Sequence, residues 1–74
     1  MKIQVKDLKV NDIFTEYGYT VQVVNIDTDS YINGNETYRI ETKLIDYNKK
    51  MFPKMNLGTT NFYCKKINTI INIK

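Results

Sequence analysis

The sequence contains no alanine, histidine or tryptophan, and only one cysteine, one proline and three glycines. Without histidine, the side chain that proteins use most often as a general base and metal ligand is missing. The single cysteine, Cys64, has no second cysteine for an internal disulfide, which favours a reducing compartment. Three glycines leave no glycine-rich phosphate loop. These absences argue against an enzyme and against a cofactor or metal site.

Long apolar runs are absent as well. No stretch approaches the ~20 apolar residues of a membrane span. Residues 1–12 mix charged and apolar side chains instead of forming the apolar block of a signal peptide. The sequence therefore predicts a soluble, cytoplasmic protein, located in a bacterial cell or in the host if a phage encodes it.

The residues that are abundant favour β-structure. Ten isoleucines and six tyrosines accompany the absence of alanine, and β-branched and aromatic residues suit strands better than helices. A chain of 74 residues is long enough for one small domain, which we expect to span residues 1–74. Lysine, asparagine and isoleucine supply 29 of the 74 residues, and their A/T-rich codons suggest a bacterial, phage or other mobile-element origin.

Alternating and β-branched stretches predict five or six short strands. They cover residues 2–6, 12–17, 19–27, 36–46, 60–65 and 67–74. Tyr19, Val21 and Val23 share one face of their strand, but Val24 and Ile26 share the other. This phase slip at Val23–Val24 predicts a bulge or sharp bend. The stretch between 47 and 59, which contains Pro53 and Gly58, is the one long irregular loop.

The stretch DLKVNDIF at residues 7–14 resembles the L-x-V-G-D turn that starts many SH3-like barrels. Asn11 stands where glycine is usual, and asparagine tolerates a positive φ better than most residues. Together with the bent strand and the short hairpins, this resemblance implies an all-β, SH3-like small barrel of five or six strongly bent antiparallel strands.

The hairpin between residues 19–27 and 36–46 turns at INGN, and its loop length sets the register. A two-residue turn at Asn33–Gly34 would place Val24 opposite Lys43. A three-residue loop, 33–35, would place Val24 opposite Leu44, Thr28 opposite Ile40 and Ser30 opposite Tyr38. We prefer the three-residue loop because it gathers apolar side chains on one face, with Arg39, Glu41 and Lys43 outward.

The strand TNFYCK leaves two faces to assign. Phe62 and Cys64 share one face, which we expect to be buried because cysteine and phenylalanine are often core residues. Tyr63 and Lys65 would then point outward. Ile67, Ile71 and Ile73 are inward in the last segment, so this assignment also requires a tight bend or one helical turn at Lys65–Lys66.

Charge is divided unequally along the chain. Residues 1–46 contain five basic and eight acidic side chains, whereas residues 47–74 contain six lysines and no acid. Basic clustering attracts polyanions or acidic protein surfaces. The acidic segment 27–36 does not match the ligand spacing of an EF-hand calcium loop in either possible frame. The basic part of the chain is therefore the better candidate for a binding surface.

The segment 47–66 combines lysine, aromatic side chains and methionine, and it is the predicted partner-binding surface. Its candidate residues are Tyr47, Lys49, Lys50, Met51, Phe52, Lys54, Met55, Tyr63, Lys65 and Lys66. Pliable apolar residues ringed by lysine suit an acidic protein partner with an apolar pocket. The contrasting interpretation is that Phe52 and Met55 fold back and cap the core while the lysines keep the loop soluble.

The sequence thus predicts a non-catalytic macromolecule-binding module, in the manner of a small phage or mobile-element inhibitor or adaptor that docks on a host protein. The partner surface would be acidic or would mimic nucleic acid. Sequence-tolerant binding of nucleic acid is the first alternative, because lysines contact phosphates and aromatic rings stack on bases. The second alternative is a structural homo-oligomer that pairs through an edge strand such as residues 69–73.

Overall fold

The computed structural model describes residues 1–32 and 35–74, with side chains for residues 1–28 and 36–74. These described residues form six strands and one short 3-10 helix, η1. Their bounds are β1 Lys2–Gln4, η1 Val5–Asp7, β2 Ile13–Glu16, β3 Tyr19–Ile32, β4 Asn35–Tyr47, β5 Thr60–Lys66 and β6 Ile70–Asn72. The predicted all-β class is confirmed. Over the described residues, no helix is long and apolar enough to cross a membrane.

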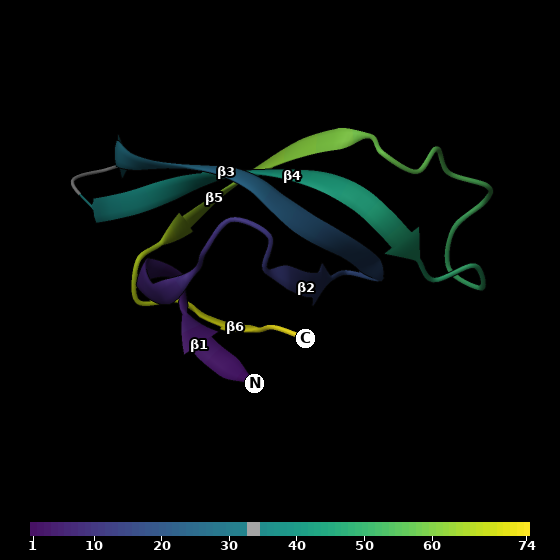
Figure 1. Cartoon of the computed structure of the whole chain (residues 1–74), viewed down its shortest axis with the longest axis horizontal. Helices are drawn as coiled ribbons and strands as arrows, with labels where there is room; N and C mark the ends of the chain where they lie inside the picture. The colour runs from purple at the N-terminus through teal and green to yellow at the C-terminus, as the bar shows by residue number, and fades with distance from the viewer. Residues whose placement is uncertain (33–34) are drawn as a thin grey trace.

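The strands form two antiparallel sheets (Figure 1). The larger sheet has the order β2-β3-β4-β5, and the smaller one pairs β1 with β6. A bridge between Phe14 and Ile73 joins the sheets, and the Lys74 N–H donates to the Ile13 carbonyl at 2.8 Å. Over the described residues, strand pairing does not close these sheets into one barrel.

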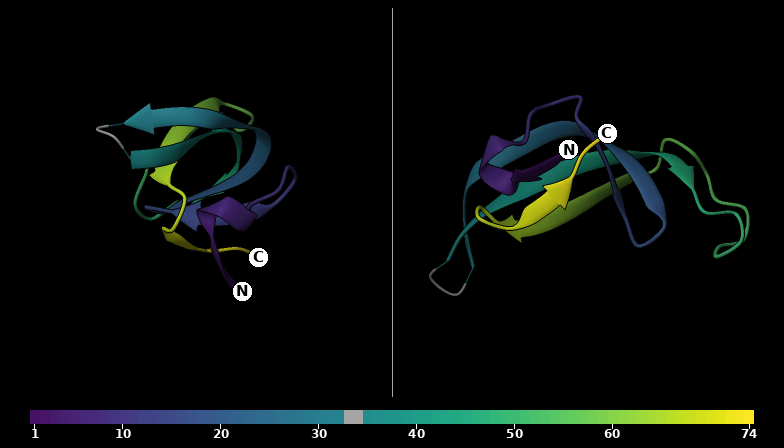
Figure 2. Two further views of the ribbon diagram at one scale, coloured as in Figure 1. Left: turned by 90° about the vertical axis from the view of Figure 1, so that its left-hand side faces the viewer. Right: turned by 90° about the horizontal axis from the view of Figure 1, so that it is seen from below.

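The larger sheet is strongly curled (Figure 2). Its two outer strands, β2 and β5, meet through side chains. Phe14 on β2 and Tyr63 on β5 make an edge-to-face contact with ring centroids 5.9 Å apart. Close by, Lys65 Nζ lies 2.6 Å from Glu16 Oε1. The curl therefore closes around the core by packing and an ion pair rather than by a ladder of hydrogen bonds.

The core fills the space inside this curl. Its buried apolar residues are Val5, Leu8, Phe14, Val21, Val23, Ile40, Leu44, Ile71 and Ile73. The strand residues among them follow the expected alternation, because successive side chains point to opposite faces of a sheet. The inward placement predicted for Ile40, Leu44, Ile71 and Ile73 is confirmed.

The bulge predicted at Val23–Val24 is also present. Val23 pairs with Thr42 and Asn25 pairs with Glu41, so Val24 is the extra residue, and its side chain is exposed. The Asn11 N–H donates to the Val23 carbonyl at 2.8 Å, immediately beside this bulge. Asn11 itself has a φ of 80°, as the resemblance to the L-x-V-G-D turn implied. The first turn of the chain therefore docks where β3 bends.

The preferred register of the β3–β4 hairpin is wrong. Leu44 pairs with Val21, Ile40 pairs with Ile26 and Ser30 pairs with Thr37. Asn35 belongs to β4 and pairs with Ile32, so it is not part of a three-residue loop. Residues 33 and 34, where the turn was predicted, lie outside the described residues. The ladder slips at three places along the hairpin. A single register counted from the turn therefore fails, because each slip changes the partner of every residue beyond it.

Two boundaries in the terminal segments differ from expectation. β1 ends at Gln4 instead of residue 6, because Val5–Asp7 forms η1 and buries Val5 in the core. The bend before β6 lies at 67–68 instead of Lys65–Lys66, and the Thr69 N–H closes it by donating to the Lys66 carbonyl at 3.0 Å. Residues 5–6 and 67–69 then bond to each other, which holds the two ends of the fold together.

Candidate binding surface

The loop 48–59, which connects β4 to β5, extends beyond the end of the larger sheet (Figure 1, right). Asn48 fixes its first turn. The Asn48 N–H donates to the Gly18 carbonyl at 2.8 Å, and the Asn48 carbonyl accepts from the N–H groups of Met51 and Phe52 at 3.1 and 3.2 Å. Its side-chain oxygen accepts from the Lys50 N–H at 2.9 Å. The backbone at the base of the loop is therefore held by the β2–β3 hairpin.

Phe52 attaches the loop to that hairpin. Its ring stacks on Tyr19, with centroids 4.6 Å apart and planes 17° from parallel. Gly18 makes room for this contact, since a Cβ there would lie 2.8 Å from Phe52 Cε2. Tyr17 and Gly18 both have positive φ, as the two central residues of a type I′ hairpin turn do. The tight turn between β2 and β3 thus creates the seat for the aromatic ring.

Tyr47 at the end of β4 and the loop residues that follow divide into an anchored set and an exposed set. Tyr47 and Met55 pack against the core, and Phe52 is half-buried. This agrees with the interpretation in which Phe52 and Met55 fold back. Lys49, Lys50, Met51 and Lys54 are exposed, together with Leu57, and Met51 and Leu57 each keep 62% of their surface accessible. We call these five exposed residues, Lys49, Lys50, Met51, Lys54 and Leu57, the loop surface.

The two faces of β5 are the reverse of the prediction. Phe62 is 52% exposed and Cys64 is exposed, whereas Tyr63 packs against the core. The cause is the pairing with β4, which places Tyr63 beside the buried Ile40 and Lys65 beside Tyr38. Tyrosine and lysine can bury their apolar stems when their polar ends find a partner. The inward-facing residues are odd-numbered both before and after 67–68. The predicted switch of the buried face from even to odd residues therefore does not occur.

The polar end of Lys65 finds that partner in Glu16. Their side chains are only 16% and 20% exposed, and they form an ion pair between β5 and β2, the two outer strands of the larger sheet. The second carboxylate oxygen, Glu16 Oε2, is buried and has no hydrogen-bond partner within the described part of the chain. Burial raises the pKa of the neighbouring Tyr63 hydroxyl, and the charges of Glu16 and Tyr19 add to this effect. Tyr63 and Lys65 therefore hold the fold together and do not extend the loop surface.

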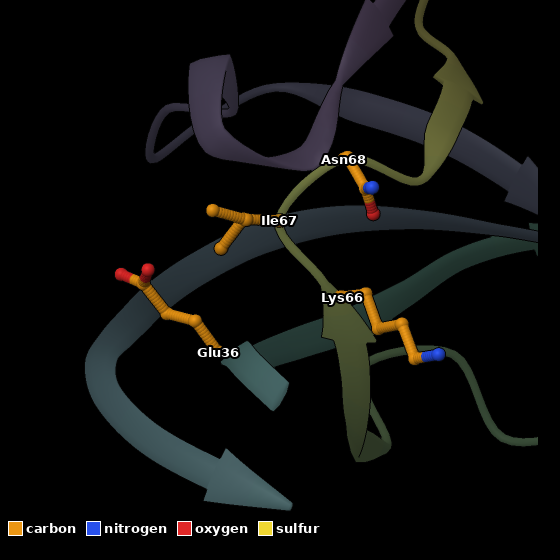
Figure 3. Close-up of a pocket in the computed structure, with 4 residues that line it drawn as sticks. All are labelled: Glu36, Lys66, Ile67 and Asn68. Carbon is orange, nitrogen blue, oxygen red and sulfur yellow. The ribbon is translucent and has the colours of Figure 1, made fainter. Parts of the chain in front are cut away.

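Lys66 lies apart from the loop as well. It borders a hollow of about 280 Å³ at the far end of β5, together with Glu36, Ile67 and Asn68 (Figure 3). The charged ends of Glu36 and Lys66 point away from each other there. Seven strand residues span roughly 20 Å, so β5 separates Lys66 from the loop. The ten candidate residues consequently do not form one continuous patch.

The outer face of the larger sheet exposes the ring of Phe62, a residue that the sequence interpretation had assigned to the core. The Arg39 guanidinium lies 4.4 Å from the centroid of the Phe62 ring, in a cation–π arrangement. On the inner side of β5 there is a second hollow of about 280 Å³. It is lined by Tyr19, Met55, Thr59, Asn61, Phe62 and Tyr63. Phe62 thus stands beside a hollow between β5 and the base of the loop.

Leu57 and Phe62 are two exposed apolar residues of this region that the sequence interpretation missed. Leu57 stands between Asn56 and Gly58 in a turn, where an apolar residue has few buried neighbours, so its position alone could have marked it as exposed. For Phe62 no comparable signal exists in the local sequence, because the pairing of β5 with β4 decides which face is buried. The candidate binding region is therefore the loop surface and the adjoining Phe62 face. Comparison with protein-family models, with curated proteins and with solved structures finds no match for this chain.

Proposed function

We propose that the protein is a non-catalytic binding module that docks on an acidic protein surface through the loop surface. The observation that supports this is the composition of the loop. Lys49, Lys50 and Lys54 accompany the exposed apolar side chains of Met51 and Leu57, in a part of the chain that contains no acid. Lysines at the edge of an interface steer an acidic partner, and a pliable methionine adapts to an apolar pocket.

The anchoring of the loop favours the same role. Phe52, Asn48 and Gly18 hold the base of the loop against the β2–β3 hairpin. A loop that is already ordered loses less conformational entropy when it binds. The anchored residues Phe52 and Met55 therefore act in this proposal by positioning the exposed side chains, and the exposed side chains make the contacts.

The proposal extends to architecture and origin. We propose that the curled sheet corresponds to an SH3-like small barrel, supported by the positive φ of Asn11 and the bulge at Val24. We also propose a cytoplasmic adaptor or inhibitor of phage or mobile-element origin, which the A/T-rich codon bias supports.

The loop surface can be tested by charge reversal with a matched control. In one variant Lys49, Lys50 and Lys54 become glutamate; in the control, the exposed Lys2, Lys6 and Lys9 do. Each set of three changes of two units lowers the formal net charge from +3 to −3. We expect a partner captured from bacterial lysate by the wild type to be retained by the control. The loop variant should bind it at least about tenfold more weakly.

Equal retention by both variants would show that the loop surface is not the docking site. Nuclease treatment of the lysate and titration with labelled single- and double-stranded DNA at about 50 mM salt address the alternative. If the protein binds DNA and only the loop variant loses this binding, the ligand of the loop surface is nucleic acid and not an acidic protein. The homo-oligomer alternative would need a free edge on residues 69–73. This is less favourable because β6 already pairs with β1 and Ile73 bridges to Phe14.

A further inference from the structure

The outer edge of β5 forms no ladder with another strand in the described part of the chain, although the side chains of Tyr63 and Lys65 reach Phe14 and Glu16 of β2 across the curl. β5 lies at the end of the larger sheet, and β4 is the strand that pairs with it in the described part of the chain. The Leu44 N–H donates to the Thr59 carbonyl, and the Ile67 N–H donates to the Glu36 carbonyl, so the odd-numbered residues of β5 face β4. In an antiparallel ladder the intervening residues face the other way. The backbone groups of Thr60, Phe62 and Cys64 therefore point away from the sheet.

The features that usually protect a strand edge are absent from this part of β5. Its pairing with β4 runs without a slip from Lys66 to Thr60, and residues 60–64 contain neither a proline nor a charged side chain. Short strands, bulges, lysine and proline are common protective devices at sheet edges. By contrast, the opposite outer strand, β2, is bridged to Ile73, and β1 is only three residues long. The 60–64 stretch is thus the best site for an added strand.

The side chains beside this edge suit alternating contacts. An added strand would point successive side chains to the two faces of the sheet. On the outer face it would meet the exposed ring of Phe62, over which Arg39 lies. On the inner side it would meet the hollow of about 280 Å³ that Tyr19, Met55 and Tyr63 help to line. One apolar side chain of the added strand could fill this hollow.

Charge decides which strand fits. Residues 47–74 contain six lysines and no acid, and the loop that carries three of these lysines leads directly into β5. A second copy of β5 would bring Lys66 of both chains to one interface without any acid from residues 47–74. We propose that the outer edge of β5 binds an extended acidic segment of a partner protein, with one apolar side chain in the hollow.

This proposal rests on the proposed function, because it specifies that the acidic partner of the loop surface binds as an extended strand along the outer edge of β5. Main-chain hydrogen bonds along 60–64 would supply affinity, and the hollow and the lysines would supply selectivity. The loop surface would then contact the part of the partner that continues beyond the added strand.

A synthetic peptide tests the edge directly. The probe is a fluorescein-labelled peptide of about nine residues in which glutamate alternates with valine, with one central leucine. We expect it to bind the wild-type protein, and we expect the same peptide with lysine in place of glutamate not to bind. Two further versions of the peptide are N-methylated at alternate amides. The version methylated at the amides that face β5 loses its hydrogen-bond donors to the strand, so it should bind about tenfold more weakly than the other version.

A proline at position 64 supplies the matching change in the protein. Cys64→Pro removes an N–H that faces away from β4, and proline is tolerated at such edge positions. Cys64→Thr is the control, since it keeps the N–H and favours a strand. We expect Cys64→Thr to bind the peptide like the wild type and Cys64→Pro to bind about tenfold more weakly. Amide exchange should be faster at Phe62 and Cys64 than at Asn61 and Tyr63, and the peptide should slow it.

Three results would overturn the edge proposal. They are no binding of the glutamate peptide at about 50 mM salt, equal binding of both N-methylated versions, and unchanged exchange at Phe62 and Cys64 in the bound protein. A dimer in sedimentation that Cys64→Pro dissociates would make a second copy the occupant and would also overturn it. The reversal of Lys49, Lys50 and Lys54 decides the proposed function separately, because a partner lost in that variant supports the loop surface whatever the peptide does.

Discussion

Among the residues whose side chains are described, Tyr63 combines a packed aromatic ring with a hydroxyl whose pKa is raised. Its ring meets Phe14 edge to face inside the curl, and its hydroxyl lies near the ion pair of Glu16 and Lys65. Burial raises the pKa of this hydroxyl above its ordinary value of 10.0, and the charges of Glu16 and Tyr19 raise it further. The folded protein therefore holds the Tyr63 proton more tightly than the unfolded chain does.

This difference predicts a loss of stability in alkali. The contribution of Tyr63 to the free energy of unfolding is complete below pH 10 and disappears as the pH rises through the higher folded-state pKa. We expect Tyr63→Phe to flatten the fall in the urea midpoint between about pH 9 and about pH 11. Tyr17→Phe, at a highly exposed tyrosine, should leave the fall unchanged. Identical pH profiles for wild type and Tyr63→Phe would contradict the assigned environment.

The same residue shows where local sequence stops being informative. In TNFYCK, hydrophobicity places Phe62 and Cys64 inside, but the structure buries Tyr63 and Lys65. The buried face depends on Ile40 across the ladder and on Glu16 across the curl, two residues far away in the sequence. A long polar side chain becomes an interior residue only when such a partner exists. This partner could not be identified before the fold was known.

Among the elements, the contact between β2 and β5 depends on the Glu16–Lys65 pair. We expect Lys65→Met to lower the free energy of unfolding by about 1–3 kcal/mol, because it leaves a largely buried carboxylate without its cation. Adding Glu16→Gln should restore most of the loss, since a neutral amide needs no counter-charge. Urea unfolding of the single and double variants measures this coupling.

Lys66→Met, at the exposed neighbouring residue, is the control and should change stability by less than about 0.5 kcal/mol. If Lys65→Met is as harmless as Lys66→Met, the ion pair does not hold the outer strands together.

The elements also show what could be predicted well. The bulge at Val24 was evident from the change of apolar phase, and the positive φ at Asn11 from a short turn motif. Both depend on a few neighbouring residues. The β3–β4 register depends instead on three slips added together, and only one of them has a clear sequence signal. The loop 48–59 was predicted almost to its limits, but the stacking of Phe52 on Tyr19 was not.

For the whole molecule, Ile73 links the two sheets. It is buried in the core and bridges to Phe14, next to the bond from Lys74 to Ile13. We expect Ile73→Ala to reduce the free energy of unfolding by about 2–4 kcal/mol. That is a large fraction of the roughly 5 kcal/mol expected for a domain of this size. Thermal and urea unfolding would measure the loss.

Ile70→Ala supplies a comparison within the same strand, because Ile70 is mostly exposed. It should cost less than about 1 kcal/mol. Equal losses for the two alanine variants would mean that Ile73 does not link the sheets as the structure indicates.

The pairing of β1 with β6 also has a consequence for synthesis on the ribosome. Lys2 pairs with Asn72, so β1 is made long before its partner, β6. Until β6 leaves the exit tunnel, Val5, Leu8 and Phe14 lack the two isoleucines, Ile71 and Ile73, that share their core. Contacts between such distant residues form slowly because a long chain segment must first be closed. The domain is therefore expected to fold as one unit once β6 has emerged from the ribosome, not progressively from β1 onward.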